Sequence, residues 1–184
     1  MNVAIVFQIM RTSEQPQHHT NLDEVIANAK ETLLRDGKHV TTLIVEGSKS
    51  LITGVIPDMP AQSGNRREYM SFIGQLAAKS GRIGKLRQIF LVSEGSVRPV
   101  GSGEEIEALQ SSGSSRKEVL IIGSIHFEEN LKFLKMFEIL RDSEKQVIGF
   151  STSLTDMIKD VSFDTPLEDA FVDGFRSESK IQPN

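Results

Sequence analysis

The chain has 184 residues, 38% of them hydrophobic, and a formal net charge of −4, which suits a single domain with a core of its own. It contains no cysteine, so disulfides, thiolate nucleophiles and sulfur-based metal sites are excluded. One Tyr and no Trp leave few aromatic surfaces for stacking on bases or sugars. The start lacks the basic region of a signal peptide, and no apolar run approaches the roughly 18 residues of a membrane span. We therefore expect a soluble, cytoplasmic protein without membrane contact.

The sequence divides into three segments. Residues 1–20 contain a short apolar stretch followed by Gln, Ser and His, and we expect a flexible lead-in or an edge strand. Residues 21–175 carry the strong helix and strand patterns, which predicts one α+β domain. Within it, residues 99–116 are rich in Gly and Ser and are expected to form a long mobile loop. Residues 176–184 are mostly polar, which predicts a disordered tail.

Two main helices are predicted from capping signals. Asn21 and Glu24 have the spacing of a capping box, in which the Asn side chain accepts from the N–H of Glu24, and Gly37 is placed to end that helix. Residues 65–81 repeat the pattern, with a box at Asn65 and an end at Ser80 and Gly81. The apolar stripe of this second helix is expected at Tyr69, Phe72, Ile73, Leu76 and Ala77.

Four segments are typical of strands. Residues 39–45 and 51–56 predict a hairpin with a four-residue loop. Residues 89–92 are apolar without interruption, which predicts a central strand buried on both faces, and the polar residues 93–95 are expected to turn the chain at its end. Residues 119–122 form the second such run, and we expect them to pair beside the first.

The last third of the domain allows two interpretations. Residues 131–140 have apolar positions every third or fourth place, as in a helix, but together with residues 147–150 they also fit a hairpin, which we favour. Thr165 and the proline after it predict a short helix over residues 166–172, which Gly174 would end.

These elements predict an α+β fold with a mixed or antiparallel sheet of about five strands covered by two main helices. The order helix, hairpin, helix and then strands resembles the roadblock and longin-like sandwiches in topology. Residues 91–94 (Leu-Val-Ser-Glu), followed by residues 116–118 (Arg-Lys-Glu) before an apolar strand, resemble a set of uncharacterised bacterial proteins over about residues 21–125. This second resemblance implies no activity.

No metal or cofactor is expected. Zinc-dependent deaminases begin with a similar order of elements, but their metal needs a His or Cys near the start of the second helix and a later pair of cysteines. Here that helix opens with Asn-Arg-Arg-Glu at residues 65–68, and cysteine is absent. The histidines have neither the HExxH pattern nor another i, i+4 pair that would share one helix face: they are His18, His19, His39 and His126.

Ser93, Glu94 and His126 are the candidate catalytic residues. Ser93 and Glu94 follow the predicted central strand, a frequent position for sites in α/β sheets, and a Ser-His-Glu triad with His126 can be written. The nucleophile-elbow motif is missing, however. The alternative interpretation is that Ser93 and Glu94 satisfy backbone groups at the strand end, and this is the interpretation that we favour.

Residues 66–98 form a locally basic block. Lys79, Arg82, Lys85 and Arg87 lie within nine residues that contain no acid, which makes them candidates for binding an anion. Cations at the end of a helix also complement its dipole, so a solvated surface explains them equally well. Because so few cations could neutralise only a few phosphates, the sequence does not favour nucleic acid as a partner.

The predicted function is a non-catalytic module that associates with itself or with a protein partner, because no convergent catalytic set is found. One alternative is an enzyme or small-ligand binder with its site at residues 93–95, closed by the loop at residues 99–116. The other is a weak nucleic-acid binder that uses the basic block.

Overall fold

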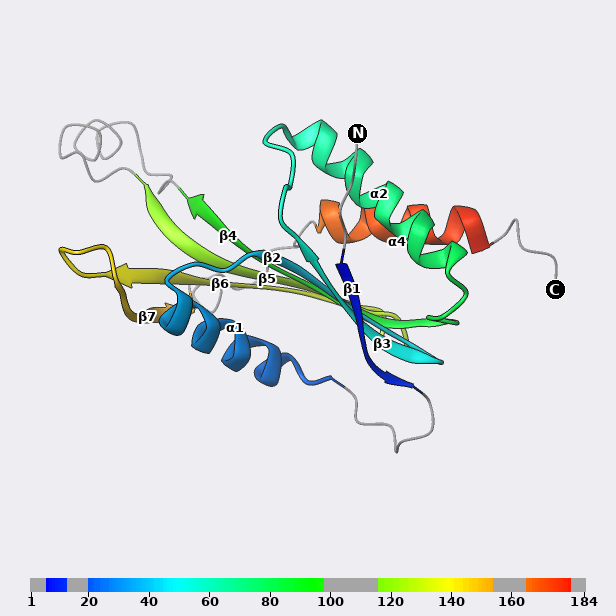
Figure 1. Cartoon of the computed structure of the whole chain (residues 1–184), viewed down its shortest axis with the longest axis horizontal. Helices are drawn as coiled ribbons and strands as arrows, with labels where there is room; N and C mark the ends of the chain where they lie inside the picture. The colour runs from blue at the N-terminus through cyan, green and yellow to red at the C-terminus, as the bar shows by residue number, and fades with distance from the viewer. Residues whose placement is uncertain (1–5, 13–19, 98–115, 154–164, 180–184) are drawn as a thin grey trace.

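The computed structural model describes residues 6–12, 20–97, 116–153 and 165–179 (Figure 1). Within these ranges seven strands form one antiparallel sheet in the order β1-β3-β2-β4-β5-β6-β7. The strands are β1 (Val6–Thr12), β2 (Thr41–Gly47), β3 (Ser50–Ile56), β4 (Leu86–Val97), β5 (Lys117–His126), β6 (Leu131–Arg141) and β7 (Val147–Ser153). The helices are α1 (Leu22–Asp36), α2 (Ser63–Lys79) and α4 (Pro166–Ser179). The predicted mobile loop falls outside the described residues, except for Arg116.

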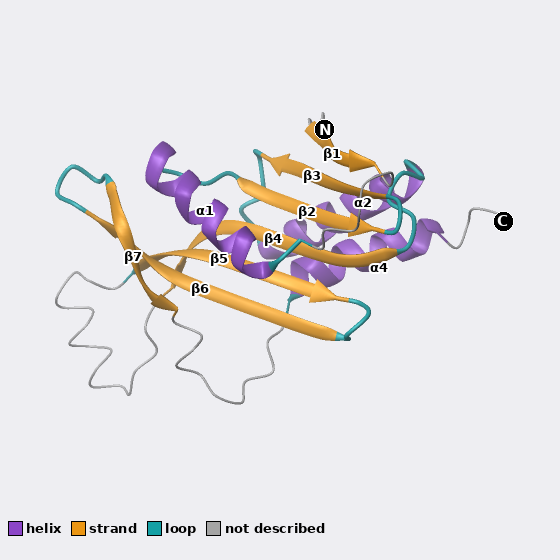
Figure 2. Ribbon diagram, turned by 90° about the horizontal axis from the view of Figure 1, so that it is seen from below, coloured by secondary structure: helices purple, strands orange, loops and turns teal. Residues whose placement is uncertain are grey.

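Helices cover both faces of the sheet. α1 lies on one face, and α2 and α4 lie together on the other (Figures 1 and 2). Two clusters of buried side chains follow this division: one joins α2 and α4 to β2, β3 and β4, and the other joins α1 to β4, β5 and β6. The predicted α+β class is confirmed, with seven strands where about five were expected.

β4 is the middle strand of the seven and is buried on both faces. Ile89 and Leu91 belong to the cluster under α2 and α4, whereas Phe90 and Val92 belong to the cluster under α1. Side chains alternate between the faces of a strand, so a strand covered on both sides must be apolar at every position. The same register pairs Val92 with Ile122 of β5, which confirms that the two apolar runs are neighbours.

The predicted turn at residues 93–95 is wrong. β4 continues to Val97, and its polar end still pairs with β5, down to Val97 opposite Lys117. Polar and glycine residues are tolerated there because β5 supplies backbone partners along the whole segment. By contrast, the hairpin interpretation of residues 131–140 is confirmed, since β6 pairs with β7. The β2–β3 hairpin is also confirmed, but its turn has two residues, Ser48 and Lys49, where four were predicted.

The helix boundaries differ slightly from the predicted ones. Asn21 caps α1 as expected, but its side chain accepts from the N–H of Asp23, at 3.0 Å, and not from that of Glu24. Gly37 ends α1 with φ 72°, in the left-handed region that the sequence predicted. α2 begins at Ser63, before the predicted box, and Gln62 caps it without a side-chain hydrogen bond.

The buried face of α2 is rotated from the predicted stripe. Phe72 and Leu76 are 43% and 37% exposed, whereas Met70, Gly74 and Ala78 are buried. The cause is α4, which packs against the side of α2 that carries the small residues. Glycine and alanine contribute little to an apolar pattern, so the sequence did not reveal this contact.

α4 is longer than predicted. It runs from Pro166 to Ser179 and passes through Gly174, which was expected to end it. Residues 176–179 of the predicted disordered tail are therefore helical, and residues 180–184 lie outside the described ranges. Phe171 and Phe175 are buried, with their rings stacked 6.2 Å apart, so this helix contributes to the core.

Two glycines allow α2 and α4 to approach closely. A Cβ atom at Gly74 would collide with the carbonyl oxygen of Phe171, and one at Gly174 would collide with the carbonyl oxygen of Ser71. In each case the obstructing group is helix backbone, which cannot turn aside as a side chain can. The two helices must therefore separate if either glycine acquires a side chain.

We predict that Gly74→Ala and Gly174→Ala each lower the free energy of unfolding by about 2–3 kcal/mol, the cost of overpacking a close contact. Gly64→Ala is the matched control, since that glycine is also in α2 but a Cβ atom there would have no neighbour within 4 Å. It should raise stability by up to about 1 kcal/mol, because alanine favours helix over glycine. Urea unfolding measures the free energy of unfolding of all three variants. Equal changes for Gly64→Ala and Gly74→Ala would contradict the close contact between α2 and α4.

Candidate functional site

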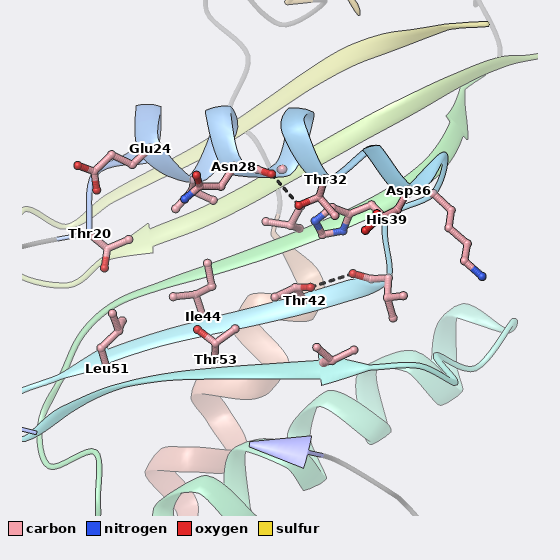
Figure 3. A pocket seen from close by; sticks show the side chains of 16 residues that line it. Thr20, Glu24, Asn28, Thr32, Asp36, His39, Thr42, Ile44, Leu51 and Thr53 are labelled. Carbon is pink, nitrogen blue, oxygen red and sulfur yellow. Dashed lines mark hydrogen bonds between the residues drawn. The ribbon is translucent and has the colours of Figure 1, made fainter. Parts of the chain in front are cut away.

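A groove of about 950 Å³ lies between α1 and the strands β2 and β3 (Figure 3). Among the described helices, only α1 lies on this face of the sheet. The α1 cluster of buried side chains extends toward β5 and β6, so the helix leaves part of the β2–β3 surface uncovered. The volume is at the upper end of the usual range for small-ligand sites, about 300–1,000 Å³.

One wall of the groove is a polar stripe on α1. Glu24, Asn28, Thr32 and Asp36 follow each other at intervals of four residues, so they lie on one side of the helix. Val25 and Ala29 lie beneath them and pack on the sheet. The hydroxyl of Thr32 donates to the carbonyl of Asn28 at 2.8 Å. This wall therefore presents amide and carboxylate groups, with the aliphatic side chains of Val25 and Ala29 beneath them.

The floor of the groove alternates hydroxyl and aliphatic side chains. Thr42 of β2 lies opposite Val55 of β3, and Ile44 lies opposite Thr53, so each pair of opposed residues joins one threonine to one aliphatic residue. Residues two apart on a strand share a face, which places all four on the groove side. The described part of the lining contains no Phe or Tyr. The floor can thus hold aliphatic groups and form hydrogen bonds, but it offers no ring for stacking.

His39 lies at one end of the groove, just after α1. Its Nδ1 atom is buried and has no hydrogen-bond partner among the described residues. Burial lowers the pKa of His39, and the backbone of Val40 and the carboxylate of Glu94 act in the opposite direction. The ring is therefore neutral near pH 7. A neutral imidazole can donate from one nitrogen and accept at the other.

Both ends of α1 are tied to β4 by polar side chains. At the first end, Gln88 donates to the carbonyl of Thr20 and to the carboxylate of Glu46, both at 2.7 Å. Glu46 in turn accepts from the backbone N–H of Thr20 at 3.0 Å. At the other end, Glu94 accepts from the backbone N–H of His39. These contacts fix the helix over the sheet and so fix the width of the groove.

Arg141 of β6 completes the second of these attachments. Its guanidinium lies 3.8 Å from the Glu94 carboxylate and 2.6 Å from that of Glu118. It also donates to the carbonyl of Gly37, at the end of α1, at 3.0 Å. A cation there complements the negative end of the helix dipole. Three strands and the helix end are thus joined through one side chain.

The charges around the groove do not favour an anion. Glu24 and Asp36 lie toward its two ends, and Lys38 is the one cation among the lining residues that the structure describes. Asp36 accepts two hydrogen bonds from its neighbour Arg35, and this contact lowers the pKa of Asp36. A neutral or basic ligand fits this arrangement better than a phosphate.

The structure does not bring the candidate residues Ser93, Glu94 and His126 together. Ser93 and Glu94 are adjacent on β4 and point to opposite faces of the sheet. His126 lies opposite Gln88, six positions along the strand from Glu94, which is a separation of about 20 Å. Glu94 instead accepts from a backbone N–H, as the alternative interpretation proposed.

A second cavity, of about 510 Å³, lies near the start of α1 and is lined by His126 and Gln88 among others. The ring of His126 stands edge-on between Phe90 and Phe133, and its Nε2 atom is buried without a described partner. Two carboxylates, those of Glu128 and Glu129, also line the cavity. The described residues contain no group of three or more His, Asp or Glu arranged to hold a metal ion.

The four candidate anion-binding residues fall into two pairs. Lys79 lies 3.4 Å from Glu178, and Arg87 lies 3.8 Å from Glu128, so acids accompany both cations. Arg82 and Lys85 are exposed in the loop between α2 and β4. No sequence pattern pointed to a fifth cation, Lys49, which the β2–β3 turn places beside that loop.

Comparison with known proteins found no match: no family model, no curated protein and no solved structure is similar to the chain. Among the described helices, none is long and apolar enough to cross a membrane. The groove and the surface themselves are therefore the basis for assigning a function.

We predict that His39 makes stability depend on pH. Because its pKa is lowered in the folded state, the unfolded chain takes up a proton at a higher pH than the folded chain does. Stability should therefore fall as the pH is lowered through the ordinary histidine value, about 6.5. Urea unfolding at about pH 7.5 and pH 5 gives the drop in the free energy of unfolding between the two pH values. This drop should be smaller for His39→Gln than for the unaltered protein. An NMR titration that places the pKa of His39 at or above its ordinary value would contradict this.

Proposed function

We propose that the protein is a non-catalytic binding module that holds a short extended peptide of a partner in the groove between α1 and β2–β3. The observation that carries the proposal is the groove itself, whose floor alternates aliphatic and hydroxyl side chains beneath a polar helix wall. Peptide chains combine aliphatic side chains with amide donors and acceptors, and so match both kinds of surface.

The length of the groove supports a peptide over a compact metabolite. Glu24 and Asp36 are twelve residues apart on α1, which corresponds to about 18 Å along the helix axis. An extended chain advances about 3.3 Å per residue, so the groove accommodates about five residues. The ends of α1 are already fixed by Gln88 and Glu94, so binding would order little of the protein.

The chemistry of the lining supports binding over catalysis. The hydroxyls of Thr32 and Thr42 each donate to a backbone carbonyl at 2.8 Å, so neither is paired with a base that would activate it (Figure 3). Among the described residues that line the groove, His39 is the one histidine, and its Nδ1 atom is buried. Glu24, at the start of α1, favours a peptide that is neutral or carries a lysine or arginine, whereas Asp36 is already paired with Arg35.

Nuclear magnetic resonance on the ¹⁵N-labelled full chain tests this proposal. The probes are pentapeptides with blocked ends that alternate valine with threonine or serine, with and without a terminal lysine. We expect the shifted amide signals to concentrate on β2, β3 and the stripe of α1 that lines the groove. We also expect the lysine-containing peptides to bind at least as tightly, because of Glu24.

A pair of matched variants controls the experiment. Asn28→Trp places a large ring in the groove and should weaken peptide binding by about tenfold or more, equivalent to about 1.4 kcal/mol. Asn65→Trp makes the same change at an exposed position of α2 and should leave binding unchanged. Equal affinities for the two variants, or shifts spread evenly over the molecule, would exclude the groove as the site.

A further inference from the structure

Three cations from two segments of the chain lie together at one end of the sheet. Lys49 is in the β2–β3 turn, and Arg82 and Lys85 are in the loop between α2 and β4. All three side chains are exposed. We call Lys49, Arg82 and Lys85 the turn cluster. None of them lines the groove, so the cluster is a separate feature of the surface.

Backbone hydrogen bonds hold the two turns to each other. Ser48 donates from its N–H to the carbonyl of Lys85 at 2.8 Å, and Lys49 donates to that of Ile83 at 3.1 Å. The hydroxyl of Ser48 accepts from the N–H of Lys85 at 3.0 Å, and the hydroxyl of Ser50 donates to the carbonyl of Arg82 at 2.9 Å. The cations therefore project from a rigid platform.

Two glycines make this close contact feasible. Gly84 has φ 73°, in the left-handed region, and a Cβ atom there would collide with the Ser48 hydroxyl. Gly47 faces the carbonyl of Ile83 with no room for a Cβ atom. Arg82 and Lys85 belong to the basic block of the sequence, whereas Lys49 is more than thirty residues earlier in the chain and joins them only through the fold.

Among the described residues, no acid is paired with the positive charge of the cluster. No described carboxylate lies within ion-pair distance of Lys49, Arg82 or Lys85, in contrast to Lys79 and Arg87. The Nζ atom of Lys49 has a weak contact, at 3.4 Å, with the carbonyl of Gly81. The whole chain has a formal net charge of −4, so the cluster is a positive region on a negatively charged protein. Such a region attracts anionic partners.

The sequence alone does not favour nucleic acid, because a few scattered cations neutralise few phosphates, but the fold gathers three cations without a described ion-pair partner on one platform. We propose that the turn cluster binds the phosphodiester backbone of single-stranded nucleic acid weakly, without reading its bases. Ile83 of the loop and Leu86 at the start of β4 are buried, so neither offers an apolar anchor of the kind that protein interfaces and membrane insertion use. Backbone phosphates require only positive charge. The turns contain no aromatic residue that could stack on a base, so binding is insensitive to sequence.

The salt dependence of this binding follows from the number of cations. Three neutralised phosphates give a slope of log K against log salt of about −2 for a single strand. Between about 50 and 200 mM salt the affinity should fall by about 20-fold. Each cation changed to glutamine should reduce the size of the slope by about 0.7.

Fluorescence anisotropy with the full chain and labelled 20-nucleotide DNA of two unrelated sequences tests the proposal. We expect the two sequences to bind within about twofold of each other with the stated slope. The triple variant Lys49→Gln, Arg82→Gln, Lys85→Gln should lose at least about tenfold in affinity at low salt. The control variant Arg67→Gln, Arg116→Gln, Lys145→Gln removes the same charge elsewhere and should stay within about threefold.

Three outcomes would overturn the proposal. They are no binding of either DNA at low salt, equal losses in the two triple variants, and binding of inorganic polyphosphate without binding of DNA. Because no member of the cluster lines the groove, peptide binding by the triple variant is measured separately. Failure of this proposal is thus distinguishable from failure of the proposed peptide site.

Discussion

Gln88 and Glu94 of the central strand hold the two ends of α1, and the position of the helix depends on them. The two residues are six positions apart on β4, about 20 Å, and the fifteen residues of α1 span about 22 Å. The helix therefore fits between its two attachments. Phe90 and Val92 lie between these two residues on β4 and are buried beneath α1. The helix therefore contacts β4 through polar groups at its ends and through apolar side chains along its middle. Removing either attachment should loosen one end of the helix without exposing the core.

This arrangement explains why the two faces of the sheet differ. On one face α2 and α4 approach closely at Gly74 and Gly174 and cover β2, β3 and β4. On the other face α1 is the one described helix, and its attachments hold it over β4. The surface of β2 and β3 beside it, with Thr42 and Thr53, is left as the floor of the groove. A surface fixed in this way can bind a ligand without first being ordered, which favours affinity.

Local patterns in the sequence predicted much of the fold but little of the site. The apolar run at residues 89–92 identified the middle strand, because a strand covered on both faces has no polar position. The α2–α4 contact was missed because it depends on glycines. Glu94 was a catalytic candidate because it follows the apolar run, and its partner, the backbone N–H of His39, is 55 residues away and gives no local signal. The groove and the turn cluster each combine segments that only the fold brings together. The local signal for the groove was the four-residue spacing of Glu24, Asn28, Thr32 and Asp36, and the local signal for the cluster was the basic block, which holds Arg82 and Lys85 but not Lys49.

Reactivity of a single introduced thiol tests most directly whether the β2–β3 floor is open to solvent. The chain has no cysteine, so Thr53→Cys, on the floor, can be compared with Leu43→Cys, which replaces a buried residue on the opposite face of the sheet. In the folded protein, a disulfide-exchange reagent should modify the thiol at position 53 at a rate close to that in the unfolded chain. The thiol at position 43 should react only as fast as the protein unfolds. Equal protection of the two thiols would mean that the floor is covered, and would contradict the groove.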